Sequence, residues 1–80
     1  MTTRQFDKRL AGLPVARQRQ IMKKLFDVAA DPYARHNNVT KLQGRDGYRL
    51  RVGDWRVIYD VQDDRLVLVA LELDTRGGIY

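Results

Sequence analysis

The stretch Tyr48-Arg-Leu-Arg-Val-Gly-Asp-Trp-Arg-Val-Ile-Tyr59 decides the fold of this chain. Its two arms are rich in β-branched and aromatic residues and alternate between apolar and polar side chains, which is typical of half-buried strands. Gly53-Asp54 between the arms favours a two-residue turn of type II′ or I′. We therefore predict an antiparallel β-hairpin over residues 48–59.

A two-residue turn fixes the pairing of the hairpin. The predicted pairs are Val52 with Trp55, Arg51 with Arg56, Leu50 with Val57, Arg49 with Ile58, and Tyr48 with Tyr59. Arg49, Arg51 and Arg56 then share one side of the sheet, the arginine face, while the apolar side chains share the other and can pack on helices. Opposed like charges cost roughly a few tenths to 1 kcal/mol without a folding benefit, and an anionic ligand would offset that cost. Alternatively, either arginine of that pair forms an ion pair with Asp60, Glu72 or Asp74.

A second hairpin is expected to follow, with its turn at Asp63-Asp64. The nearly unbroken apolar run from Leu66 to Leu73 predicts a strand buried on both faces. Continuing the register pairs Ile58 with Val69 and adds an apolar floor to the arginine face, made of Ile58, Val67, Val69 and Leu71. Arginines beside these apolar residues suit a groove that binds an RNA strand or an amphipathic partner segment. Alternatively, a helix of the chain itself covers the apolar floor.

The N-terminal part predicts two helices. Phe6, Leu10 and Leu13 form one stripe of a short helix with Thr2 or Thr3 as N-cap. Pro14 suits the first turn of a second helix, which Asp31-Pro32 ends. Its broad apolar face comprises Ile21, Met22, Leu25, Phe26, Val28 and Ala29. Residues 41–42 are candidates for a further short strand. The pattern predicts an α+β fold, with a helical hairpin packed on a small antiparallel sheet, in one domain spanning residues 1–80.

Composition narrows the functional classes. The net charge of +5 suggests a polyanionic partner, with simple solubility as the alternative. Without cysteine, and with His36 as the only histidine, the chain offers neither a disulfide nor a cluster of soft metal ligands, and we expect no metal and no cofactor. No signal peptide or membrane span is evident, so we expect a cytoplasmic protein without a membrane partner.

Lys41-Leu-Gln-Gly44, followed by Gly47-Tyr and the hairpin through Tyr59, resembles the signature of the RelE/ParE superfamily of toxin-antitoxin toxins. The family fold usually has a β-strand before the first helix. Only Met1 to Gln5 precede Phe6 here, so we expect this first edge strand to be shortened or absent. In the RelE branch the toxin cleaves mRNA in the ribosomal A site. The resemblance implies catalytic roles for Arg49, Arg51, Arg56, Arg76 and Tyr80, and RNA binding by Lys41, Arg45, Arg49, Arg51 and Arg56.

The resemblance also implies partners: a cognate antitoxin, the ribosome and mRNA, with DNA contacted only indirectly through the antitoxin. Cleavage by attack of an RNA 2′-hydroxyl needs a proton acceptor as well as cations. Arginine is a poor base, and Asp74, Tyr80, Lys41 or a group on the RNA or ribosome could serve. Two alternatives remain, a ParE-like inhibitor of DNA gyrase and a non-catalytic family member that binds an antitoxin.

Overall fold

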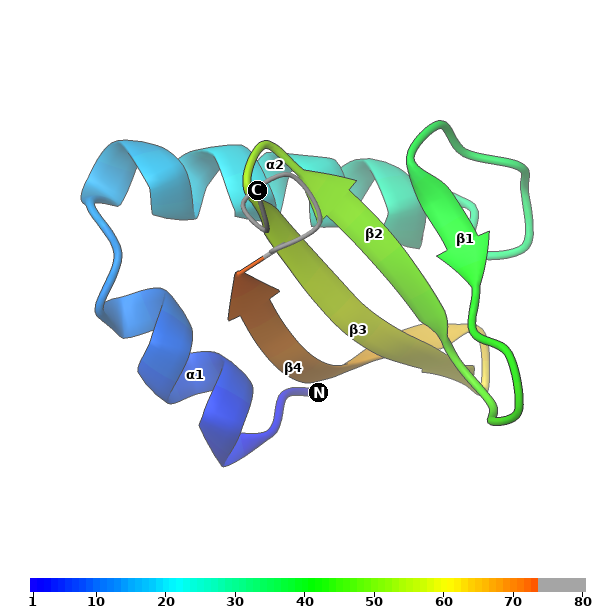
Figure 1. Ribbon diagram of the computed structural model, residues 1–80. Helices are drawn as coiled ribbons and strands as arrows, with labels where there is room; N and C mark the ends of the chain where they lie inside the picture. Colours follow the sequence, from blue (N-terminus) through cyan, green and yellow to red (C-terminus); the bar gives the residue numbers. More distant parts are fainter. Residues whose placement is uncertain (74–80) are drawn as a thin grey trace, which may run out of the picture.

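The computed structural model describes residues 1–73. Its elements are α1 (Arg4–Ala11), α2 (Val15–Ala30), β1 (Val39–Lys41), β2 (Tyr48–Val52), β3 (Trp55–Gln62) and β4 (Arg65–Leu73). The strands form one antiparallel sheet in the order β1-β2-β3-β4, and both helices lie on the same side of it (Figure 1). This confirms the predicted α+β fold. Among the described residues, neither helix has the length and hydrophobicity needed to cross a membrane.

The helical hairpin follows the predicted boundaries closely. The Thr3 hydroxyl caps α1 by accepting a hydrogen bond from the Phe6 amide at 3.2 Å, and α2 begins directly after Pro14. The buried face of α2 is narrower than predicted, because Phe26 is 68% exposed. Neighbouring residues point about 100° apart on a helix, so Phe26 turns away from the sheet when Leu25 packs against it.

The apolar face of the hairpin forms the core with the helices, as predicted. Leu50, Val52, Val57 and Tyr59 are all nearly inaccessible to solvent, and Phe6 joins them from α1. The rings of Tyr48 and Tyr59 stack at the end of this face, with centroids 5.4 Å apart. The opposite side of the sheet, which carries the arginine face, is not covered by α1 or α2 (Figure 1).

The hairpin register is confirmed at all five predicted pairs. Gly53 has a φ of 57°, whereas Asp54 does not have a positive φ, the pattern of a type II′ turn. β1 was predicted around Lys41-Leu42 and begins instead at Val39, where it pairs with Leu50 of β2. The central part of the sheet is therefore set by the turn that the sequence specifies.

The register between β3 and β4 differs from the prediction. A bulge between Ile58 and Tyr59 pairs Ile58 with Ala70 and Tyr59 with Leu68, which leaves Val69 as an extra residue on β4. Because side chains alternate between faces, one extra residue moves everything beyond it to the other side. Leu71 consequently lies opposite Val57 on the helix side with 0% exposure, and its predicted place on the arginine face is wrong.

β4 is also not buried on both faces. Leu66, Leu68 and Leu71 are buried toward the helices, whereas Val67, Val69 and Ala70 are only half-buried. No helix of the described chain covers the other side, so apolar residues there remain partly accessible. The unbroken apolar run reflects a strand with one buried face and one partly open apolar face.

The N-terminal segment covers the outer edge of β4. Thr2 forms an isolated parallel bridge with Leu68, the Thr3 amide donates to the Leu68 carbonyl at 3.0 Å, and the Leu68 amide donates to the Met1 carbonyl at 2.8 Å. Farther along, the side chain of Gln5 donates to the carbonyl of Leu71 at 3.2 Å and accepts from its amide at 2.9 Å. The first edge strand of the family fold is thus shortened to one bridge, as expected.

Gly47 shapes the loop between β1 and β2. Its φ is 117°, and a Cβ at this position would lie 3.0 Å from the Tyr59 carbonyl oxygen. The Gly47 carbonyl accepts a hydrogen bond of 3.0 Å from the Leu42 amide, which closes the loop. Only glycine fits this close approach without strain, and the loop it permits carries Leu42 and Arg45.

Candidate nucleic-acid interface

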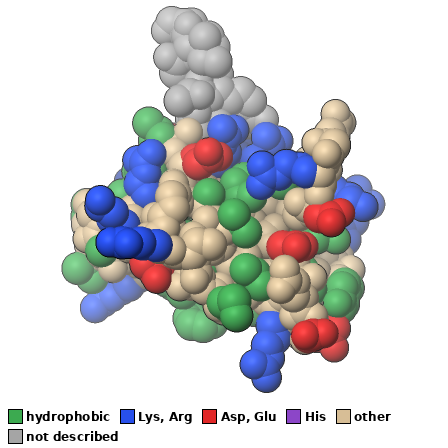
Figure 2. Space-filling view, turned by 90° about the horizontal axis from the view of Figure 1, so that it is seen from below, with side chains coloured by type: hydrophobic (Ala, Val, Ile, Leu, Met, Phe, Trp, Pro, Cys, Tyr) green, Lys and Arg blue, Asp and Glu red, His purple; other side chains and the backbone are tan. Residues whose placement is uncertain are grey.

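The arginine face gathers cations from β2 and β3. Arg49 and Arg51 lie on β2 and Arg56 lies opposite Arg51 on β3, as the predicted register requires. Arg49 and Arg56 are half-buried and Arg51 is exposed. In the view of Figure 2, basic side chains lie among acidic and hydrophobic ones rather than in an unbroken patch.

A hollow of about 260 Å³ opens on the arginine face, and we call it the arginine pocket. It is lined by Leu42, Arg45, Arg49, Arg56, Ile58, Ala70 and Glu72. The arginines come from two strands and from the loop that Gly47 closes, while Ile58, which is 8% exposed, belongs to the apolar part of its lining. Guanidinium groups around an apolar surface suit an anion attached to a less polar group, such as a phosphate in a nucleotide chain.

Arg56 is held by a carboxylate. Its Nε donates to Oε1 of Glu72 at 3.1 Å, and the two side chains are 31% and 43% exposed. Arg51 likewise has an interaction partner. The alternative of an ion pair with Glu72 is therefore confirmed for Arg56, and this contact offsets part of the repulsion between the opposed arginines without a ligand.

The remaining predicted site residues fall in three groups. Arg45 lines the arginine pocket with Arg49 and Arg56. Lys41 pairs with Tyr48, so its strand position belongs to the helix side of the sheet and not to the arginine face. Arg76 and Tyr80 lie outside the described residues. The structure therefore brings together three of the predicted RNA-binding arginines and separates Lys41 from them.

The predicted apolar floor is smaller than expected. Ile58 is buried, and Val67 and Val69 are half-buried on β4, while Leu71 faces the core. Glu72 and Ala70 line the pocket instead. The sequence offered Glu72 as one of three candidate partners for the arginines, but it did not place Ala70 here, because nothing in the sequence marks the bulge. A partner segment on this side would meet Val67 and Val69 beside the charged pocket.

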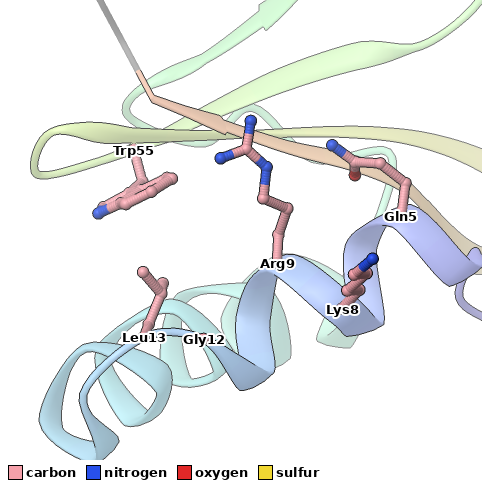
Figure 3. Close-up of a pocket in the computed structure, with 6 residues that line it drawn as sticks. All are labelled: Gln5, Lys8, Arg9, Gly12, Leu13 and Trp55. Carbon is pink, nitrogen blue, oxygen red and sulfur yellow. The ribbon is translucent and has the colours of Figure 1, made fainter.

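A larger cavity, of about 530 Å³, lies between α1 and Trp55 at the start of β3 (Figure 3). The Trp55 ring and the Leu13 side chain face each other across its opening, and Arg9 reaches toward the sheet. Gln5, which also lines this cavity, is occupied by its two hydrogen bonds to Leu71. Arg9 stands in the last turn of α1, where a cation stabilises the helix dipole, so a structural role accounts for this residue.

No tyrosine with a raised pKa and no group of metal ligands is found in the arginine pocket among the described residues. Burial raises the pKa of Tyr59 to about 12, with a smaller contribution from Tyr48, and this phenol faces the helices. Within residues 1–73, no three histidine, aspartate or glutamate side chains are grouped so that they could hold a metal ion. The described part of the site offers cations, one carboxylate and an apolar surface as its chemical groups.

Comparisons with known proteins agree with this geometry. A family model described as "ParE toxin of type II toxin-antitoxin system, parDE" matches residues 2–80. RelE in the archaeal RelE-RelB complex from Pyrococcus horikoshii OT3 is similar at 33% identity and a TM-score of 0.79, covering 94% of this chain and 92% of that chain. A comparison with curated proteins gives no significant match.

Two further solved structures share the fold. A chain of the RelB-RelE antitoxin-toxin complex from Methanococcus jannaschii has 21% identity and a TM-score of 0.74, covering 100% of this chain and 94% of that chain. The isolated Escherichia coli RelE toxin has 24% identity and a TM-score of 0.76, covering 94% of this chain and 82% of that chain.

Proposed function

Since this chain belongs to the RelE/ParE superfamily of type II toxin-antitoxin toxins and is RelE-like in fold, we propose that it is a ribosome-dependent mRNA endonuclease. It would inhibit translation by cleaving mRNA in the ribosomal A site. The observation that carries the proposal is the arginine pocket, where Arg45, Arg49 and Arg56 converge on one hollow beside an apolar surface. Such a hollow is suited to holding a backbone phosphate while the neighbouring base contacts apolar side chains.

The reaction requires an RNA 2′-hydroxyl to attack the adjacent phosphate. The transition state carries extra negative charge on the phosphate oxygens, which Arg49 and Arg56 stabilise by charge-assisted hydrogen bonds. Holding the attacking and leaving oxygens in line contributes a further several kcal/mol, on the order of what good alignment yields elsewhere. Arg51 supplies phosphate affinity next to the pocket. The family resemblance implies catalytic roles for Arg76 and Tyr80, and Tyr80 would stack on a splayed base or help with proton transfer.

A cognate antitoxin is the expected partner in the cell, because the similar chains from Pyrococcus horikoshii and Methanococcus jannaschii were both solved in toxin-antitoxin complexes. We propose that an amphipathic antitoxin segment contacts Ile58, Val67 and Val69 and covers the arginine pocket. Leu71 is left out of this surface, since it is buried in the core. The antitoxin, and not the toxin, would make the contact with DNA. Because its proposed targets are the ribosome and mRNA, the toxin would act in the cytoplasm.

Expression in bacteria tests this function. Induction of the chain should stop growth and produce mRNA 5′ ends within codons on ribosomes. An Arg49→Ala/Arg56→Ala variant should be harmless. The matched control, Arg19→Ala/Lys23→Ala, removes the same charge from the exposed side of α2 and should remain toxic. Growth arrest with intact transcripts would refute the proposal.

A second candidate is inhibition of DNA gyrase, favoured by the ParE description of the matching family model. This function needs a protein-binding surface and no nuclease chemistry, and the shared fold is compatible with it. It predicts broken DNA and a DNA-damage response while mRNAs stay intact. Mapping transcript ends and DNA breaks in the same induced culture therefore separates the two functions.

A further inference from the structure

The proposed cleavage needs a group that removes the proton of the attacking 2′-hydroxyl. Arginine cannot do this, because its guanidinium stays protonated throughout the range in which enzymes work. Among the described residues that line the arginine pocket, Glu72 is the only one with a proton-accepting side chain. Asp60 also belongs to this side of β3, but it does not line the pocket and its Oδ1 accepts from the Val61 amide at 2.8 Å.

Glu72 reaches the pocket because of the bulge in β4. Had the pairing at Tyr59 continued without interruption, Arg56 would oppose Leu71, and Glu72 would oppose Trp55 on the helix side. The extra residue shifts the pairing by one, so that Arg56 opposes Glu72 instead. The bulge thus exchanges a leucine for a carboxylate at the pocket, and bulges elsewhere are known to redirect side chains beside active sites.

The contact with Arg56 leaves both groups able to bind substrate. Nε of Arg56 is the donor to Oε1 of Glu72, and the terminal nitrogens of this guanidinium make no hydrogen bond within residues 1–73. The Glu72 side chain is 43% exposed, so an RNA strand in the pocket can contact it. Arg56 could therefore hold the Glu72 carboxylate through Nε and bind the phosphate through its terminal nitrogens. This would keep the base next to the phosphorus that is attacked.

We propose that Glu72 is the general base of this site, an inference that rests on the proposed endonuclease function. Glu72 takes the proton of the 2′-hydroxyl, and the 2′-oxygen forms a bond to phosphorus as the bond from phosphorus to the 5′-oxygen breaks. The departing 5′-oxygen takes a proton from solvent, and Glu72 returns its proton to solvent. The products are a 2′,3′-cyclic phosphate and a free 5′-hydroxyl, with no net consumption of water.

The test is single-turnover cleavage of an mRNA bound in the A site of programmed ribosomes, by the full-length chain. Glu72→Gln keeps the shape of the side chain and removes the proton acceptor. It should slow cleavage by about 100-fold or more, the usual contribution of a general base, while binding to the programmed ribosome changes by less than about 3-fold. Asp60→Asn removes the same charge from the same side of the sheet and should leave the rate unchanged.

The dependence of the rate on pH gives a second readout that a structural role would not change. Among the described residues, the charged groups that line the pocket with Glu72 are Arg56 from β3, Arg49 from β2 and Arg45 from the loop before β2. All three are arginines, a residue type that is not deprotonated in proteins. In the wild type the rate should therefore fall on the acidic side as Glu72 is protonated. Glu72→Gln should lack this acidic limb, and Glu72→Asp should retain it at a lower rate.

Other outcomes overturn the inference in distinguishable ways. If Glu72 only occupies Arg56 until a phosphate displaces it, Glu72→Gln will cleave as fast as the wild type or faster. If the ion pair only maintains the pocket, binding and rate will fall together, and the acidic limb will remain. If the wild type itself leaves the mRNA intact, the proposed function fails and the assignment of Glu72 fails with it.

Discussion

Replacing Leu71 by alanine tests the bulge through its energetic consequence. Leu71 is 0% exposed and lies opposite Val57, which is also fully buried, so truncation leaves a cavity in the core. Comparable leucine truncations cost about 2 to 5 kcal/mol. At roughly 0.05 to 0.15 kcal/mol per residue, a chain of 80 residues has a stability of about 4 to 12 kcal/mol. Leu71→Ala should therefore remove at least about a sixth of the total, and in a marginally stable chain nearly all of it.

Val67→Ala is the matched control, because Val67 is half-buried on the uncovered side of the same strand. It should cost about 1 kcal/mol or less. With a urea m-value of about 1 kcal/mol/M, a loss of 3 kcal/mol lowers the unfolding midpoint by about 3 M, three times the shift of the control. Leu71→Val provides a measurable intermediate if the alanine variant does not fold. Equal midpoint shifts for Leu71→Ala and Val67→Ala would refute the register described for β4.

Three further predictions concern the loop, the core phenol and the pocket. Gly47→Ala should lower the free energy of unfolding by at least about 1 kcal/mol more than Gly44→Ala, because both have positive φ but only Gly47 closely approaches the Tyr59 carbonyl; equal losses in urea unfolding would contradict this. The pKa of Tyr59 is raised from 10.0 to about 12, so its protonated form contributes stability that is complete below pH 10 and is lost as the pH rises through 12. The unfolding free energy of the wild type should therefore fall by up to about 3 kcal/mol relative to Tyr59→Phe over that range, and parallel pH curves would count against it. Arg49→Ala should reduce the slope of log affinity for single-stranded RNA against log salt by about 0.7, whereas Arg19→Ala on α2 should leave the slope unchanged.

The parts of the fold that local chemistry specifies were predictable from the sequence. Gly53-Asp54 admits few turn geometries, and with a two-residue turn every pair of the hairpin follows. The N-cap at Thr3 and the start of α2 after Pro14 depend on similarly local rules. The three arginines of the hairpin could therefore be assigned to one side of the sheet before the structure was known.

The parts that depend on contacts between distant segments were not predictable. No glycine or proline marks the bulge at Val69, so Leu71 was assigned to the wrong side, and Glu72 was only one of three candidate partners for the arginines. Phe26 belongs to an apolar run, but its exposure depends on which residues of α2 meet the sheet. The cations of the site were thus predicted, and the tertiary structure shows that Glu72 is the carboxylate bonded to Arg56.

The covered edge of β4 has a consequence for how the protein is made. The Gln5 and Leu71 groups that bond to each other are 66 positions apart, so the beginning of the chain must wait for its partner to be synthesised. Contacts of such long sequence separation are late and slow to form. Of the residues that line the arginine pocket, Leu42 and Arg45 are synthesised early, whereas Ala70 and Glu72 are synthesised about as late as Leu71. A nascent chain therefore has no finished arginine pocket until β4 has been synthesised.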